Sequence, residues 1–154
     1  MTSTLRTAPA GRHVMLRPLR SPQRWALAGA AAVAAGAHIP VIAPHLEEAP
    51  YMGALFILLT AACVALAAAA LVRDSAAVYA LAGLTCGLAI IGYAATRLVP
   101  FPMLADDVGN WLEPLGVVSV LSEAVAVTAA ITALVRRPRG ARGGRGEPSP
   151  LPCA

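Results

Sequence analysis

The sequence predicts an all-α integral membrane protein in which four spanning helices form a bundle. Hydrophobic residues make up 58% of the 154 residues and charged residues only 13%, whereas ordinary soluble domains have about 25% charged residues. The apolar residues form four long blocks, and a bilayer-spanning helix needs roughly 20 such residues. Open strands are excluded because a lipid-facing edge would leave backbone groups without hydrogen-bond partners.

The four expected helices cover about residues 25–42, 51–72, 76–98 and 112–135. The prolines lie outside the second and third blocks and near or beyond the ends of the others, as expected where helices stop and start. We therefore expect Pro40 and Pro44 to mark the end of the first helix. Pro114 is expected in the first turn of the fourth.

Basic segments flank this four-helix domain, which covers residues 25–135. All 12 basic residues are arginines, and most of them lie in residues 1–24 and 136–154. The second segment is rich in Arg, Gly and Pro, a composition that predicts disorder. Arg73 lies between the second and third blocks and therefore on the same side of the membrane as both termini. Arg97 is then the one arginine on the opposite side. The positive-inside rule then predicts that both termini are cytoplasmic.

The same arginines bear on the partners of the chain. Because they flank membrane spans, their charge is explained by the lipid bilayer, and we expect no nucleic-acid partner. Gly83 and Gly87 form a GxxxG motif, which marks a close helix contact. That contact is either within the bundle or with a membrane partner, such as a second copy in a homo-oligomer.

Two alternatives concern the start of the chain. Ala35-Gly36-Ala37 fits a signal-peptide cleavage pattern, and cleavage there would make His38 a new amino terminus able to chelate copper. The apolar character continues through Ile42, so we expect the first span to be retained. Met15 is an alternative translation start.

Glu123 is the most informative residue, because it lies about 11 residues into the fourth block, near the expected bilayer centre. A carboxyl group there is costly and usually functional or paired. Helical side chains tilt toward the helix amino terminus, so Tyr93 and His38 reach a similar depth, and Ser119 lies one turn away. We expect a proton or ligand site made of Glu123, Tyr93, His38 and Ser119. A neutral Glu123 with a purely structural hydrogen bond is the alternative.

The stretch "DDVGNWLEPLG", residues 106–116, is explained in large part by the start of a helix. Asn110 and Glu113 form an N-x-x-E capping box, and Trp111 suits a membrane interface. Arg97 is expected to form a partly buried ion pair with Glu113 or Asp107.

A second polar cluster contains His45, Glu47, Glu48 and Asp106. We expect it on the same side of the membrane as the stretch 106–116. Imidazole and carboxylate groups bind divalent metals such as zinc, copper, iron or manganese. A divalent metal is therefore a possible cofactor, and an exposed acidic rim is the alternative interpretation.

Cys63 and Cys86 lie at a similar expected depth in the second and third helices. They are either neighbours near mid-membrane or small apolar residues that fill a tight interface. No CxxC motif is present, which argues against a thiol oxidoreductase or a zinc knuckle.

At "HIPVIAPHLEEAPYMGALFILL" and "DDVGNWLEPLGVVSVLSE" the chain resembles a group of uncharacterised small four-span integral membrane proteins of high-GC Gram-positive (actinobacterial) type. The resemblance covers about residues 25–135. It implies a plasma-membrane location and carries no activity with it.

These observations favour a transporter or a transporter-accessory subunit, with an outward-facing acidic and histidine cluster and an intramembrane Glu123. One alternative is a membrane protein that binds a metal or another small ligand, and a second is a structural or partner-binding subunit. No nucleophile with an adjacent base and no redox motif is visible, so we do not expect an enzyme.

Overall fold

The computed structural model describes residues 21–136, and this part of the chain is all-helical. The four long helices are α2 (Gln23–Glu48), α3 (Pro50–Arg73), α4 (Ala76–Leu98) and α5 (Pro114–Val135), and the short 3-10 helix η1 (Ala105–Asp107) precedes α5. Each long helix is long and apolar enough to cross a membrane, which confirms the four predicted helices. The expectations for residues 1–20 and 137–154, including disorder of the tail and the start at Met15, lie outside the described residues.

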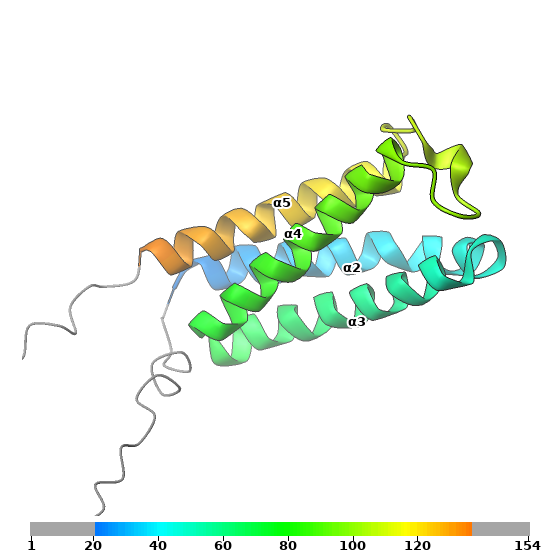
Figure 1. Cartoon of the computed structure of the whole chain (residues 1–154). Helices are drawn as coiled ribbons and strands as arrows, with labels where there is room; N and C mark the ends of the chain where they lie inside the picture. Colours follow the sequence, from blue (N-terminus) through cyan, green and yellow to red (C-terminus); the bar gives the residue numbers. More distant parts are fainter. Residues whose placement is uncertain (1–20, 137–154) are drawn as a thin grey trace, which may run out of the picture.

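The helices run antiparallel in chain order, and neighbours around the bundle follow the order α3, α2, α5, α4 (Figure 1). α3 packs closely on α2, α2 on α5, and α5 on α4, whereas α3 makes little contact with α4. We call the end that contains the turn at Asp74 the terminal end. The end that contains Ala49 and the loop 99–113 is called the loop end. The bundle is therefore least closed on the side between α3 and α4.

The core toward the terminal end is built mainly from alanine. Small side chains allow helices to approach closely, which is the usual way in which membrane helices associate. The larger buried side chains of this cluster are Leu27, Leu66 and Tyr79. A Cβ added at Gly83 would lie 3.5 Å from the Cβ of Ala130 in α5, whereas one added at Gly87 would meet nothing within 4 Å. Gly83 therefore serves packing within the bundle.

The prediction that the first helix ends near residue 42 is wrong, because α2 continues through Pro40 and Pro44 to Glu48. A proline cannot donate to the carbonyl four residues earlier, but such losses are tolerated in membrane helices packed against neighbours. The break comes instead at Ala49 (φ −142°, ψ 83°), directly before Pro50. A residue that precedes proline is pushed out of the helical region.

The fourth helix begins two residues later than predicted, and its cap is Glu113 instead of Asn110. The Glu113 carboxylate accepts hydrogen bonds from the backbone N–H groups of Leu115 (3.0 Å) and Gly116. Pro114 occupies the first helical position, where its missing N–H costs nothing. The capping box proposed for Asn110 and Glu113 is therefore wrong, and Glu113 alone caps α5.

A buried polar cluster at the terminal end was not predicted. Asp74 adopts a left-handed conformation (φ 32°) between α3 and α4 and is buried. Its carboxylate accepts from the backbone N–H of Ser21 (2.8 Å) and from the Tyr79 hydroxyl (2.7 Å). These bonds tie the start of α2 to the α3–α4 turn and hold three helices together at this end.

Candidate functional site

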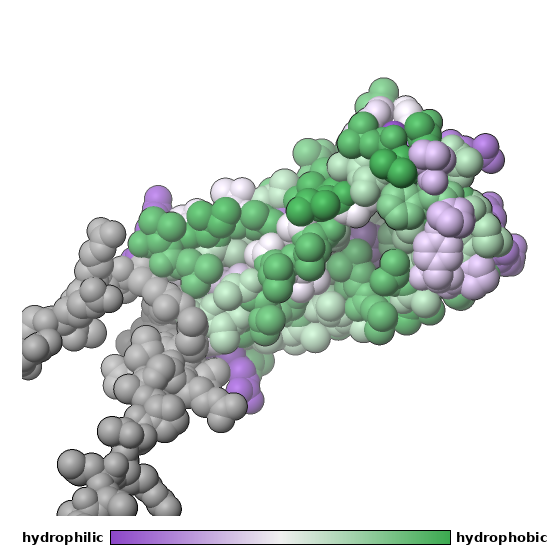
Figure 2. Space-filling model, viewed as in Figure 1, coloured by the Kyte–Doolittle hydropathy of each residue, from purple (hydrophilic) through white to green (hydrophobic). Residues whose placement is uncertain are grey.

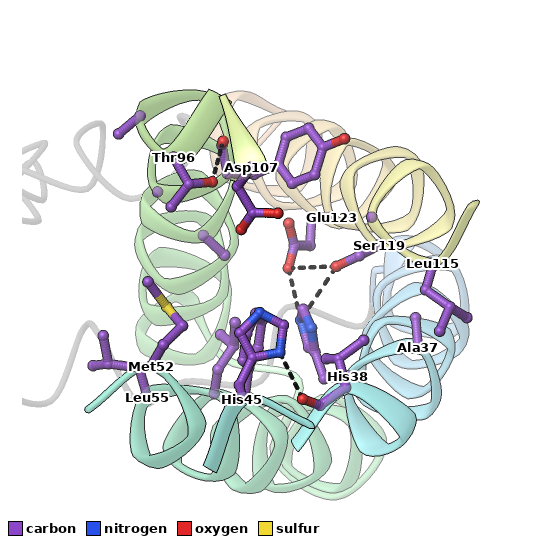
Figure 3. A pocket seen from close by; sticks show the side chains of 18 of the residues that line it. Ala37, His38, His45, Met52, Leu55, Thr96, Asp107, Leu115, Ser119 and Glu123 are labelled. Carbon is purple, nitrogen blue, oxygen red and sulfur yellow. Dashed lines mark hydrogen bonds and ion pairs between the residues drawn. The ribbon is translucent and has the colours of Figure 1, made fainter. Parts of the chain in front are cut away.

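Three of the four residues predicted for the inner site meet between α2 and α5 (Figure 3). His38 Nε2 lies 3.0 Å from Glu123 Oε1. The Ser119 hydroxyl lies 3.2 Å from His38 Nε2 and 3.3 Å from Glu123 Oε1. Glu123 is 1% exposed and His38 is 5% exposed. We call His38, Ser119 and Glu123 the polar triad.

The two oxygens of the Glu123 carboxyl group have different surroundings. The hydrogen bonds from His38 and Ser119 both go to Oε1. Within residues 21–136, Oε2 has no hydrogen bond. It is also not completely enclosed by other atoms. Because Glu123 lines a cavity, Oε2 is the oxygen that is available to a molecule in that cavity.

The fourth predicted residue, Tyr93, lines the same cavity, but its hydroxyl makes no hydrogen bond to the triad, so the predicted bond is wrong. Its hydroxyl donates to the backbone carbonyl of Trp111 (2.9 Å) at the loop end. The ring has room there because α5 presents Gly116, where an added Cβ would lie 2.5 Å from Tyr93 Cε2. The Arg97 guanidinium covers the same ring, 4.7 Å from its centroid. Tyr93 therefore fixes the loop 99–113 to α4.

Arg97 forms the ion pair predicted for it, with Asp107 and not with Glu113. Arg97 Nη1 lies 2.6 Å from Asp107 Oδ1 and donates to the Asp107 carbonyl (3.2 Å). Glu113 is excluded as the partner because its carboxylate caps α5. Arg97 is 7% exposed, and its Nε is buried without a hydrogen-bond partner among the described residues.

A cavity of about 660 Å³ lies beside the triad, toward the loop end. This volume is within the range of about 300 to 1,000 Å³ that is typical of small-molecule sites, which are mostly apolar with a few polar groups. The lining follows that pattern. The polar members include His38, Glu123 and Arg97. Most of the other lining residues are apolar, and the largest share of these belongs to α3 and α4.

Phe56 is a cavity residue that the sequence did not single out. Its ring centroid lies 5.5 Å from that of His38 and 4.8 Å from that of His45, the latter in an edge-to-face arrangement. The signal that could have found Phe56 in the sequence is that it is an aromatic residue in a segment of small and aliphatic residues. Phe56 holds the His38 ring from the α3 side, opposite α5.

The residues predicted as a metal site do not come together as one. His45 Nδ1 is hydrogen-bonded to the Val41 carbonyl (2.7 Å), and Glu47, Glu48 and Asp106 are exposed. No group of three or more metal-binding side chains is found within residues 21–136. The prolines of α2 did not end the helix, so His45 stays in helical register and bonds back to its own turn. The acidic side chains form an exposed rim instead.

Cys63 and Cys86 are neighbours, as one of the two interpretations of the sequence held. Both are fully buried free thiols, and their side chains approach one another between α3 and α4. They lie next to the cavity, on the side toward the terminal end.

Fold and site together define a class, that of multi-pass helical membrane proteins with an internal polar cluster beside an apolar cavity. No protein-family model, curated protein or solved structure matches the chain.

Proposed function

We propose that the protein is a small plasma-membrane transporter or transporter-accessory subunit that binds a ligand in the cavity and links binding to a proton on the polar triad. One observation carries this proposal. Glu123 is 1% exposed and receives both of its hydrogen bonds on Oε1, while Oε2 is open to the cavity. A buried ionisable residue in a spanning helix is expensive to maintain and commonly marks a proton or substrate pathway.

The chemistry follows from the charge of the pair. When His38 and Glu123 share one proton, the pair is neutral overall, whichever of the two residues carries it. A net charge in an apolar environment is costly, so a positively charged ligand at Oε2 is favoured only if that proton leaves. Binding of one cation therefore releases about one proton, which is the stoichiometry of a proton-coupled exchanger.

We test this linkage with the cation tetraphenylphosphonium as the probe. Purified protein in weakly buffered detergent is titrated while a pH indicator reports proton release. We expect about one proton per bound cation for the wild type, and none for Glu123→Gln. Glu48→Gln, which removes an exposed carboxylate at the loop end, is the matched control and should behave like the wild type. Cation binding without proton release by the wild type would contradict the proposal.

We also propose that both ends of the described chain face the cytoplasm. Arg24, Arg73 and Arg136 lie at the terminal end, whereas the exposed acidic rim lies at the loop end. This asymmetry follows the positive-inside rule. Reporter fusions after Arg136 and within the loop 99–113 should report cytoplasmic and external locations, respectively. The opposite pair of results would reverse the proposed orientation.

A further inference from the structure

The loop 99–113 covers the loop end of the cavity. Phe101, Leu104 and Asp107 of this loop line the cavity. The cover is fixed to α4 by the Arg97 ion pair with Asp107 and to α3 by the Tyr51 hydroxyl, which donates to the Pro102 carbonyl (2.7 Å). A molecule that comes from the water at this end therefore meets a closed surface.

The opening lies on the side, between α3 and α4. Leu58 of α3 and Leu88 of α4 line the cavity although they are 66% and 59% exposed. Residues that line a cavity and are also exposed mark its rim. Figure 2 shows a recess between these helices with hydrophilic surface inside and hydrophobic surface on both sides. In a membrane this opening faces lipid hydrocarbon.

The lining defines the chemistry of an occupant. Most lining side chains are apolar, so an apolar body is bound by the removal of its surface from water or from a looser environment. Within the polar triad, Oε2 of Glu123 is an acceptor oxygen without a hydrogen bond among the described residues, and it is suited to an N–H donor. An amine is also the uncharged group that can accept the proton of the pair.

We infer that the ligand is a lipid-soluble amine, which enters from the bilayer between α3 and α4 and binds with its nitrogen at Glu123 Oε2. This inference rests on the proposed function and names its substrate class. The neutral amine arrives with its lone pair free, and the proton held by Glu123 and His38 moves to the nitrogen. The product is an ammonium group paired with the carboxylate, while His38 and Ser119 stabilise Oε1. Total charge in the cavity is unchanged by this step, so no ion has to cross the hydrocarbon.

Two glycines of α4 provide a matched pair of variants. Gly92 lines the cavity and is exposed, whereas Gly87 does not line it, and an added Cβ meets nothing within 4 Å at either position. Gly92→Phe places a ring at the opening, and Gly87→Phe places the same ring elsewhere on the same helix. Leu58→Trp, on the opposite rim, is a second obstruction at a side chain that is already exposed.

The experiment measures binding of radiolabelled dodecylamine to the full chain in nanodiscs, with methylamine, dodecanol and dodecanoate as competitors. We expect saturable binding that unlabelled dodecylamine displaces at least ten times more effectively than each of the other three. Gly92→Phe and Leu58→Trp should weaken binding at least tenfold, while Gly87→Phe retains it. Glu123→Gln should bind dodecylamine and dodecanol equally. Unfolding temperatures identify any variant that has lost its fold.

The outcomes separate this inference from the proposed function. If methylamine competes as well as dodecylamine and both rim variants bind normally, entrance from the bilayer is wrong, although loss of the preference for the amine in Glu123→Gln would still support a Glu123 site. If dodecanol or dodecanoate competes equally in the wild type, the amine class is wrong. If Glu123→Gln keeps the wild-type preference for the amine, both the inference and the proposed function fail.

Discussion

Glu123→Ala is expected to unfold the bundle more easily and to abolish the release of a proton on ligand binding. The substitution removes the partner of a buried imidazole N–H and of the Ser119 hydroxyl. Breaking a buried pair by removing one member costs roughly 3 kcal/mol or more, because the other member stays buried without a partner. Thermal unfolding in detergent should therefore show a clear drop in midpoint.

Glu123→Gln separates stability from titration. Its amide has nearly the shape of the carboxyl group and still offers an oxygen to His38 and Ser119, so we expect a loss of no more than about 1 kcal/mol. Proton release should nevertheless be absent. A His38→Ala, Glu123→Ala double-mutant cycle tests the contact itself, because the double variant should lose less than the sum of the single losses. Additive losses would show that the two side chains do not stabilise one another.

Arg97→Ala is expected to have the second largest effect, a loss of about 2 kcal/mol. This lies between the values for exposed and fully buried ion pairs, because Arg97 is buried while the Asp107 side chain is 27% exposed. The substitution also removes the guanidinium from the face of Tyr93, a cation–π contact worth about 0.5 to 2 kcal/mol. We expect a protease to cleave the loop 99–113 at a temperature at which the bundle is still folded.

Controls for Arg97 are available on both sides of the pair. Arg97→Lys keeps the charge but loses the planar group that stacks on Tyr93, so it should recover only part of the stability. Asp107→Ala should resemble Arg97→Ala, and Asp106→Ala, at the exposed neighbouring acid, should be neutral. Equal melting of Arg97→Ala and wild type would show that the pair does not hold the cover.

Depth along a helix could be read from the sequence, and this explains why part of the site was predictable. His38, Ser119 and Glu123 were placed together by counting residues from helix ends and by the tilt of helical side chains, and the structure has them within 3.3 Å of one another. The bounds of α4 were also predicted, because Asp74-Ser75 and Pro100 flank a continuous apolar block.

The predictions that were wrong concern features that depend on contacts between segments far apart in the chain. The direction of Tyr93 is decided by the absence of a side chain at Gly116 in another helix. The continuation of α2 through Pro40 and Pro44 depends on packing against α3 and α5, which local proline rules do not include. The cavity itself results from the separation of α3 and α4, and neither helix records that separation in its own sequence.

The alanine-rich contact between α2 and α5 makes the polar triad depend on residues that carry no chemistry. Ala30, Ala126 and Ala130 belong to one buried cluster, and the distance between packed helices is set by the side chains at their contact. His38 and Glu123 are joined at 3.0 Å, and a hydrogen bond is lost once the atoms move apart by about 0.6 Å or more. A larger side chain at Ala126 would act as a wedge and separate them. Inactivating substitutions should therefore form a stripe along the α2–α5 seam that extends well beyond the ionisable residues.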